Sequence, residues 1–253
     1  MNNKYLFAHY LRAIAVISVI LTHYGTAFFN NNVTLSSMVN VPPLIDTTYP
    51  KLVEALAIPP SLPAFMAVFG VSVFFLISGF VIPMSIERYG LFDFLIKRFF
   101  RLYPTYITVL LINAVVAIVG LVIFYHTGLR YAYSGDDIFF TAFMGLNNII
   151  GHWMVLDPVA WTLAIELIFY FIAAFMFSFF FKLKSERIIS WWQIIIIAFI
   201  INLTAIKISK YSEFLSSHFS FVNVAVLIKS LYLIAFMFIG TTFFIHAKKK
   251  DID

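Results

Sequence analysis

Two ionisable side chains, Arg12 and His23, interrupt the apolar stretch LRAIAVISVILTHYG near the N-terminus. Histidine can accept a proton from a hydroxyl near neutral pH and return it later, which is the chemistry of a general base. Ionisable groups inside an apolar run are functional candidates by default, because keeping them there is costly. The structural alternatives are that Arg12 extends its charged end to the lipid headgroups and that His23 makes a hydrogen bond between helices.

The spacing of Arg12 and His23 places both on one face of a helix. They are 11 residues apart, and at about 100° per residue this is about 20° past three full turns. The rise of a helix then separates them by about 16 Å along its axis. Small or modest side chains share or border this face, so another helix or a ligand chain can approach it closely. These residues are Ala8, Ala15, Val16 and Val19.

A carboxylate, Glu166, lies inside another apolar run, WTLAIELIFY. Thr162 and Tyr170 stand four residues before and after it and share its helix face, with Trp161 nearby. A lone carboxylate in a span needs a partner, a water molecule or a proton, which makes Glu166 a candidate site residue. The alternative is a structural hydrogen bond between helices. Lys229 has a weaker case and is more simply a deep basic residue paired with another group.

Small residues are frequent in the run GVSVFFLISGF, residues 70–80. Such a run favours either tight packing against another helix or a narrow passage for a ligand chain. Both interpretations stay open from the sequence. The residues are Gly70, Ser72, Ser78 and Gly79.

Two arginines, Arg98 and Arg101, stand three residues apart in KRFFRLYP, residues 97–104. At that spacing they share a helix face, which we place at the cytoplasmic surface of the membrane. Two guanidinium groups on one face suit the phosphates of a cytosolic ligand, because their donors match phosphate oxygens. The alternative is a basic anchor that sets the orientation of the chain.

Composition predicts that the chain is an integral membrane protein. Of 253 residues, 62% are hydrophobic and only 11% are charged, and the mean hydropathy is +0.95. A soluble domain of this size needs far more charge to cover its surface. There is no cysteine, which excludes disulfides and thiolate metal sites. The basic residues lie in clusters between apolar runs, so the net charge of +5 is no nucleic-acid signal.

Apolar runs of about 20 residues, the length that spans a bilayer core, recur along the chain. Lipid leaves every backbone polar group to be satisfied within its own segment, so each run is predicted to be a helix. The predicted fold is an all-α polytopic bundle of about six spans, in a single membrane domain over residues 1–253. The six runs cover residues 5–29, 63–83, 103–125, 159–181, 188–206 and 221–246.

The distribution of lysine and arginine predicts the orientation of the chain. Alternate connections and the C-terminal end carry basic clusters, at residues 88–101, 182–187 and 248–250, and the opposite side carries fewer basic residues. The positive-inside rule then places both termini in the cytoplasm. In that orientation Arg12 lies in the cytoplasmic part of its span and His23 in the outer part.

These stretches together resemble the membrane-bound acyltransferase family 3, the O-acetyltransferase-like integral membrane acyltransferases of bacteria. LRAIAVISVILTHYG has the family's spacing of an arginine, ten residues and a histidine. GVSVFFLISGFVI, IKRFFRLYPTY with its arginine pair, and WTLAIELIFYF with tryptophan and glutamate follow in the family's order. The resemblance covers roughly residues 5–175.

The resemblance implies transfer of an acyl group, expected to be acetyl, from cytosolic acyl-CoA to a hydroxyl of a cell-surface or exported carbohydrate. It implies the bacterial inner membrane as the location, with no metal and no nucleic-acid partner. His23 is then the general base, and Glu166 orients it or neutralises the imidazolium. The arginine pair holds the CoA phosphates, and the thin pantetheine arm runs between helices. The residues expected to bind substrate or cofactor are Arg12, Arg98, Arg101, Ser78, Gly79, Trp161 and Tyr170.

The sequence departs from the family pattern in two places. An acidic residue and a glycine usually precede the Leu-Arg pair, where this chain has His9 and Tyr10. The family domain usually has about ten spans, so the C-terminal spans are expected to be absent from this chain. Two other functions stay open: a transporter of a lipid-linked sugar or small solute, which also needs buried polar residues in a bundle, and an inactive or partial relative.

Overall fold

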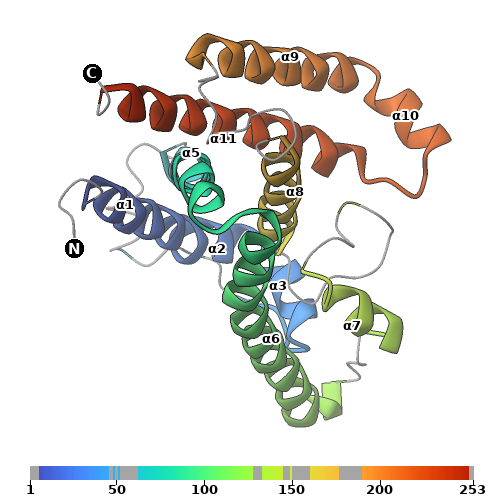
Figure 1. Ribbon diagram of the computed structural model, residues 1–253. Helices are drawn as coiled ribbons and strands as arrows, with labels where there is room; N and C mark the ends of the chain where they lie inside the picture. Colours follow the sequence, from blue (N-terminus) through green and yellow to red (C-terminus); the bar gives the residue numbers. More distant parts are fainter. Residues whose placement is uncertain are drawn as a thin grey trace. The chain divides into compact units, whose positions relative to one another are not determined.

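All regular elements in the described part of the chain are helical (Figure 1). The computed structural model describes residues 6–45, 48, 51, 62–127, 133–144, 149, 160–176 and 190–250. The principal elements, in chain order, are α1 (Leu6–Thr22), the π-helical turn η2 (His23–Ala27), α2 (Phe28–Asn30), α3 (Asn32–Met38), α5 (Leu62–Tyr89), α6 (Leu91–Ile123), the 3₁₀ turn η3 (Tyr125–Thr127), α7 (Gly135–Thr141), α8 (Trp161–Phe175), α9 (Trp191–Lys210), α10 (Ser212–His218) and α11 (Val224–Lys250).

The predicted spans correspond to long apolar helices, which confirms an all-α polytopic bundle. Among the described residues, five helical segments are long and apolar enough to cross a membrane. The fourth predicted span appears as the shorter apolar helix α8, and its predicted extension over residues 177–181 lies outside the described residues, as does the basic cluster at 182–187. The five segments are Leu6–Asn30, Met66–Tyr89, Leu91–Ile123, Trp191–Lys210 and Val224–Lys248.

The connection between the second and third spans differs from the sequence prediction. We placed the span ends at Pro83 and Tyr103, but α5 continues to Tyr89 and α6 begins at Leu91, so the basic segment is helical. Prolines are tolerated inside membrane helices, because neighbouring groups satisfy the backbone carbonyl that the ring leaves free. The one residue between the helices is Gly90, whose φ of +78° suits glycine and allows the sharp reversal.

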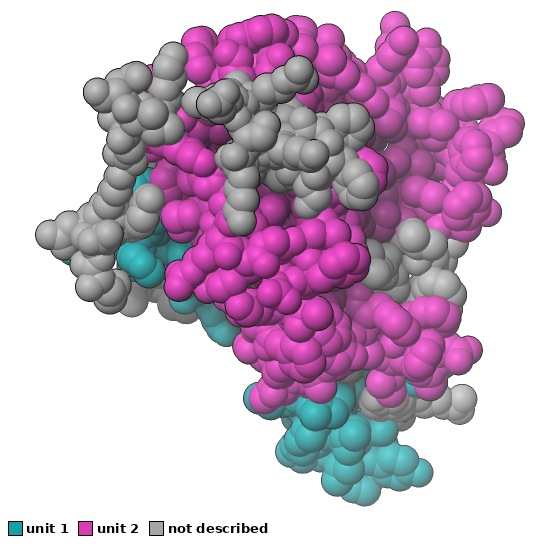
Figure 2. All heavy atoms as spheres, viewed as in Figure 1, with its two compact units in different colours: residues 1–74, 111–134 teal, residues 75–110, 135–253 magenta. Residues whose placement is uncertain are grey.

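The chain divides into two compact units (Figure 2). The boundary between them falls within α5 and again within α6. The first comprises residues 1–74 and 111–134, and the second residues 75–110 and 135–253. The single-domain prediction is not decided by this division and stays a prediction. In the first unit, Gly70 lies against the backbone of Ala15 in α1, where an added Cβ would stand 2.7 Å from the carbonyl oxygen.

The second unit is organised by a close, parallel contact between α5 and α11. A Cβ at Gly79 would stand 1.8 Å from the carbonyl oxygen of Met237, and a Cβ at Gly240 would stand 2.0 Å from that of Leu76. Thr241 donates a hydrogen bond from Oγ1 to the carbonyl of Gly79, at 2.9 Å. Small residues permit such close packing of membrane helices, where hydrogen bonds and van der Waals contact replace the hydrophobic effect.

Two further helices pack on α11. The rings of Phe169 in α8 and Phe238 in α11 meet edge to face, with centroids 5.3 Å apart. α9 runs alongside α11 (Figure 1), and at its start the backbone N–H of Ser190 donates to Oε1 of Gln193 at 3.2 Å. The result is a scaffold that fixes α5 and α8 relative to each other, and both helices carry candidate site residues.

Candidate functional site

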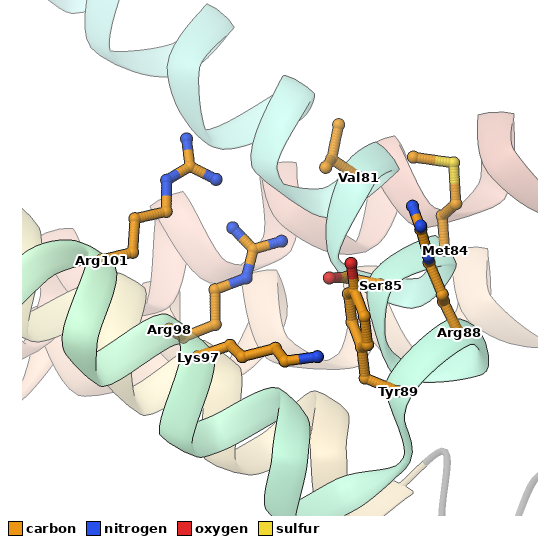
Figure 3. Close-up of a pocket in the computed structure, with 8 residues that line it drawn as sticks. All are labelled: Val81, Met84, Ser85, Arg88, Tyr89, Lys97, Arg98 and Arg101. Atoms are coloured by element: carbon orange, nitrogen blue, oxygen red, sulfur yellow. The ribbon is translucent and has the colours of Figure 1, made fainter.

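A cavity of about 460 Å³ opens between the C-terminal end of α5 and the N-terminal part of α6. Its volume falls in the range of roughly 300–1,000 Å³ that is typical of small-molecule sites. The α5 residues recur at helical spacing on one face, and the α6 side chains reach toward them (Figure 3). The lining residues are Val81, Met84, Ser85, Arg88, Tyr89, Lys97, Arg98 and Arg101.

The ionisable lining of this cavity is basic, with four cationic side chains and no carboxylate among the lining residues. A concave wall of one sign of charge focuses the electrostatic potential and raises the local concentration of an oppositely charged ligand. The other wall, formed by Val81, Met84 and Ser85, is largely apolar. The cavity therefore suits an anionic ligand that also carries an apolar portion.

Arg98 is the most buried of these cations, with 9% of its surface exposed. Its guanidinium carbon lies 5.4 Å from the ring centroids of both Phe94 and Tyr170. Among the described residues, no carboxylate forms an ion pair with it. Because a buried charge without a direct ion-pair partner is costly, and aromatic faces offset only part of that cost, Arg98 is suited to bind an anion from the cavity.

The other side of the cavity contains a second group of cations around Tyr89. The Nζ of Lys97 lies 3.5 Å from the centroid of the Tyr89 ring, and the guanidinium carbon of Arg88 lies 5.2 Å from it. Figure 3 shows the two cations on opposite sides of the ring, with Tyr89 itself extending toward Ser85. The ring thus holds the two cationic side chains in the lining of the cavity.

Glu166 lies in a hydrogen-bonded cluster that joins α5 and α8. The hydroxyl of Tyr170 donates to Oε1 of Glu166, and Oγ of Ser78 donates to the same oxygen at 3.4 Å. The Glu166–Tyr170 bond confirms that the two share a helix face. Because Arg98 lies over the ring of Tyr170, the cluster continues into the cationic cavity. Ser78, Glu166, Tyr170 and Arg98, which the sequence analysis selected separately, are therefore neighbours.

Two other predicted site residues of this unit have structural contacts. The backbone of α11 fills the space at Gly79, so packing accounts for that glycine without a ligand. The Trp161 ring lies 5.9 Å from the Nζ of Lys229, which gives that lysine an aromatic partner. The assignment of Gly79 and Trp161 to ligand binding stays a prediction.

His23 and Arg12 belong to the first unit, and His23 is the first residue of the π-helical turn η2. Its Nδ1 lies 2.8 Å from the carbonyl oxygen of Val19. A carbonyl only accepts hydrogen bonds, so in the neutral ring Nδ1 carries the proton and Nε2 keeps its lone pair. The side chain is exposed, and Arg12 is partly buried. Isolated π-helical turns are frequent at functional sites.

The small-residue face of α1 is buried only in part. Ala8 and Ala15 are buried, and Ser18 and Thr22 continue the buried line. Val16 is instead exposed, because one residue rotates it by about 100° from Ala15.

Sequence reasoning missed the part of the site formed by Arg88, Tyr89 and Lys97. The two cations were used only to predict orientation, and Tyr89 was not considered. The sequence did contain a signal for it. Gly90 is the only glycine between the second and third apolar runs, and basic residues flank it on both sides. A glycine there predicts a sharp corner between helices, and such a corner brings flanking side chains together. The packing residues Gly240 and Thr241 were also missed, in a region taken as ordinary membrane helix.

These features define a multi-pass membrane protein with a basic cavity and a partly buried carboxylate cluster. The model of the acyltransferase family described as "Acyltransferase domain" matches residues 5–252, and the chain belongs to this family, acyltransferase family 3. The match extends well beyond residue 175, where the motif resemblance ended. A search of curated proteins and a search of solved structures found no match. Membership of the family supports acyl transfer as the general reaction.

Proposed function

We propose that the protein transfers an acyl group, expected to be acetyl, from cytosolic acyl-CoA to a hydroxyl of a cell-surface or exported carbohydrate. The observation that carries the proposal is the basic cavity at the α5–α6 corner, with the buried Arg98 in its wall. CoA is a polyanion with a long, thin and largely uncharged arm. A cavity with cations on α6 and an apolar wall on α5 matches both parts of that molecule.

The proposed orientation places this cavity on the cytoplasmic side, where acyl-CoA is found. Lys248 of α11 forms an ion pair with Glu87 of α5, with 2.5 Å between Nζ and Oε1. The C-terminal lysines and the corner after α5 therefore lie at the same end of the second unit. Basic clusters favour the cytoplasmic side of a membrane, which supports this placement. We accordingly propose the bacterial inner membrane as the location.

In the proposed reaction, His23 acts as the general base. Nε2 removes the proton from the acceptor hydroxyl, whose oxygen attacks the thioester carbonyl and forms the new C–O bond. The C–S bond then breaks, and the proton passes from the imidazolium to the CoA thiolate. The contact of Nδ1 with the Val19 carbonyl supports this role, because it leaves Nε2 as the basic nitrogen.

The remaining residues have binding and positioning roles in the proposal. Arg98 and Arg101 hold the phosphates of CoA, and Arg12 either binds CoA or stabilises the helix bundle. Glu166 supports the site as a charged group. Ser78 and Tyr170 hold Glu166 through their hydroxyls. The match to an acyltransferase family favours this enzyme over the transporter that the sequence also allowed.

The donor role is tested by measuring the affinity of the purified protein for acetyl-CoA in detergent. Replacing Arg98 and Arg101 by alanine should weaken binding roughly 10- to 100-fold, as expected for the loss of charged hydrogen bonds. Because Arg98 is buried, Arg101→Ala alone serves as a second variant, at an exposed side chain. The control is Lys207→Ala with Lys210→Ala, which removes two exposed positive charges from α9. Unchanged affinity in both arginine variants, with normal folding, would leave only the anchor role.

A further inference from the structure

Two of the four cations of the cavity, Arg88 and Lys97, gather around the Tyr89 ring, and Arg98 and Arg101 form a second pair. Arg98 and Arg101 lie on α6, and α6 continues from them into its long apolar part. Arg88 and Lys97 lie at the corner, on either side of Gly90 and around the Tyr89 ring. Lys97 is one residue nearer the corner than Arg98 and four nearer than Arg101, which is about 1.5 Å and about 6 Å along the helix axis.

We propose that Arg88 and Lys97 form a second phosphate subsite, which binds the phosphate monoester on the ribose of CoA. This inference rests on the proposed donor. CoA carries a diphosphate, with one negative charge on each phosphate, and separately a monoester with a charge of about −1.5 to −2 at pH 7. Two pairs of cations therefore match two separate anionic groups of this ligand in charge.

The position of the two pairs assigns each to one group of the ligand. The pantetheine arm leaves CoA from the diphosphate and must extend toward the membrane interior, where the thioester reacts. The diphosphate therefore lies at Arg98 and Arg101, the pair nearer the apolar part of α6. The ribose phosphate is then directed toward the corner. There Arg88 and Lys97 have exposed side chains that reach the ligand without a buried-charge cost.

The Tyr89 ring accounts for the geometry of the corner pair. With Lys97 at 3.5 Å and Arg88 at 5.2 Å from its centroid, the ring holds two like charges near each other. Like charges repel, and the negative face of an aromatic ring offsets part of this repulsion. A dianionic phosphate offsets the remainder when it binds. In this inference Tyr89 is a positioning residue, and Arg88 and Lys97 make the contacts with the ligand.

The test compares CoA with dephospho-CoA, which lacks only the ribose phosphate, by calorimetric titration of the purified full chain. The wild-type protein should bind CoA roughly 10- to 100-fold more tightly than dephospho-CoA. Replacing Arg88 and Lys97 by glutamine should remove this preference by weakening CoA binding alone. Arg101→Gln should weaken binding of both ligands by a similar factor. Lys207→Gln with Lys210→Gln, which removes two positive charges elsewhere, should leave the preference intact.

The possible results distinguish a failure of the Arg88–Lys97 subsite from a failure of the acyl-CoA donor proposal. Equal wild-type affinities for CoA and dephospho-CoA contradict the subsite and leave the donor proposal standing. Failure to bind either compound contradicts the donor proposal and the subsite with it. Phospholipid headgroups present the same phosphate chemistry, so the titration is repeated with phosphatidylglycerol added to the detergent. Displacement of CoA by that lipid in the wild type, but not in the Arg88→Gln, Lys97→Gln variant, would assign the corner to the membrane and overturn the inference.

Discussion

Arg98 and Glu166 are opposite charges that contact the same side chain, Tyr170. The hydroxyl of Tyr170 donates to the carboxylate, and its ring faces the guanidinium. Tyr170 is almost completely buried, and its ring also meets that of Phe94 at 5.7 Å. A side chain held this firmly keeps the two charged groups at a fixed separation. Tyr170 therefore links the basic cavity to the carboxylate cluster.

Replacing Glu166 by glutamine tests whether its charge supports catalysis. Glutamine keeps the shape and can still accept from Ser78 and Tyr170, but it removes the negative charge. The rate of acyl transfer should fall about tenfold or more, equivalent to about 1.4 kcal/mol of transition-state stabilisation. Protein level and CoA affinity should change little, and both are measured in the same preparation. A variant with the wild-type rate would mean that the site needs no charge at this position.

The residue-scale features could be predicted from sequence only where partners lie on one helix. Tyr170 follows Glu166 by one helical turn, so their contact follows from helix geometry. The hydrogen bond from Ser78 could not be predicted, because it depends on how α5 packs against α8. The cation group at Tyr89 was missed for the same reason. Its members come from different helices, and only the corner at Gly90 brings them together.

The packing of α5 on α11 is the element-scale feature on which the second unit depends. Gly79 and Gly240 let the two backbones approach, and contacts continue along both helices from Leu76 to the Glu87–Lys248 ion pair. The rings of Phe80 and Phe244 meet edge to face within this contact, at 6.0 Å. Ser78 precedes Gly79, so the same contact also fixes the donor to Glu166.

Replacing Gly79 by alanine should therefore destabilise the fold. The added Cβ overlaps the backbone of Met237, and the helices must move apart. Overpacking typically costs about 1–3 kcal/mol, and the displacement should also weaken the Ser78–Glu166 hydrogen bond. Thermal unfolding in detergent measures the change. The control is Gly135→Ala, because nothing lies within 4 Å of a Cβ there. Equal thermal stability of both variants would contradict the close contact.

The sequence predicted which segments are helices better than where they end. Run length and hydropathy identify a span because lipid requires internal hydrogen bonding of the backbone. Hydropathy falls at Pro83 and in the basic segment that follows, although α5 and α6 are both helical there. Helical hydrogen bonding does not require apolar side chains, so a helix can extend beyond the membrane core. Helix ends in such segments depend on a local cause such as Gly90.

At the scale of the whole molecule, both termini are predicted to be cytoplasmic. The ion pair between Lys248 and Glu87 adds a structural reason, because it places the C-terminal end of α11 beside the basic corner. A reporter that is active only in the cytoplasm should work when fused after Lys250. A periplasm-active reporter should work when inserted within residues 134–137. Periplasmic activity at Lys250 would reverse the orientation and, with it, the proposed side of the donor cavity.

The sequence could not predict which of the site residues lie in the same compact unit. The motif order identified the family, which the match over residues 5–252 confirms. The sequence motifs gave residues in both units, with Arg12 and His23 in the first and Glu166 and the arginine pair in the second. Hydrophobic runs contain no information on how helices from distant parts of the chain associate, since most of their surface only has to match lipid.

We propose that this protein acylates an exported carbohydrate and that His23 is the base. The most direct measurement is mass spectrometry of surface glycans from cells that lack the gene, express the wild type or express His23→Gln. Loss of a general base typically costs about 10²–10⁴-fold in rate. We therefore expect acylated glycans only with the wild type, at equal protein levels. Identical glycans with and without the gene would contradict the proposed reaction, and full acylation by His23→Gln would contradict the role of His23.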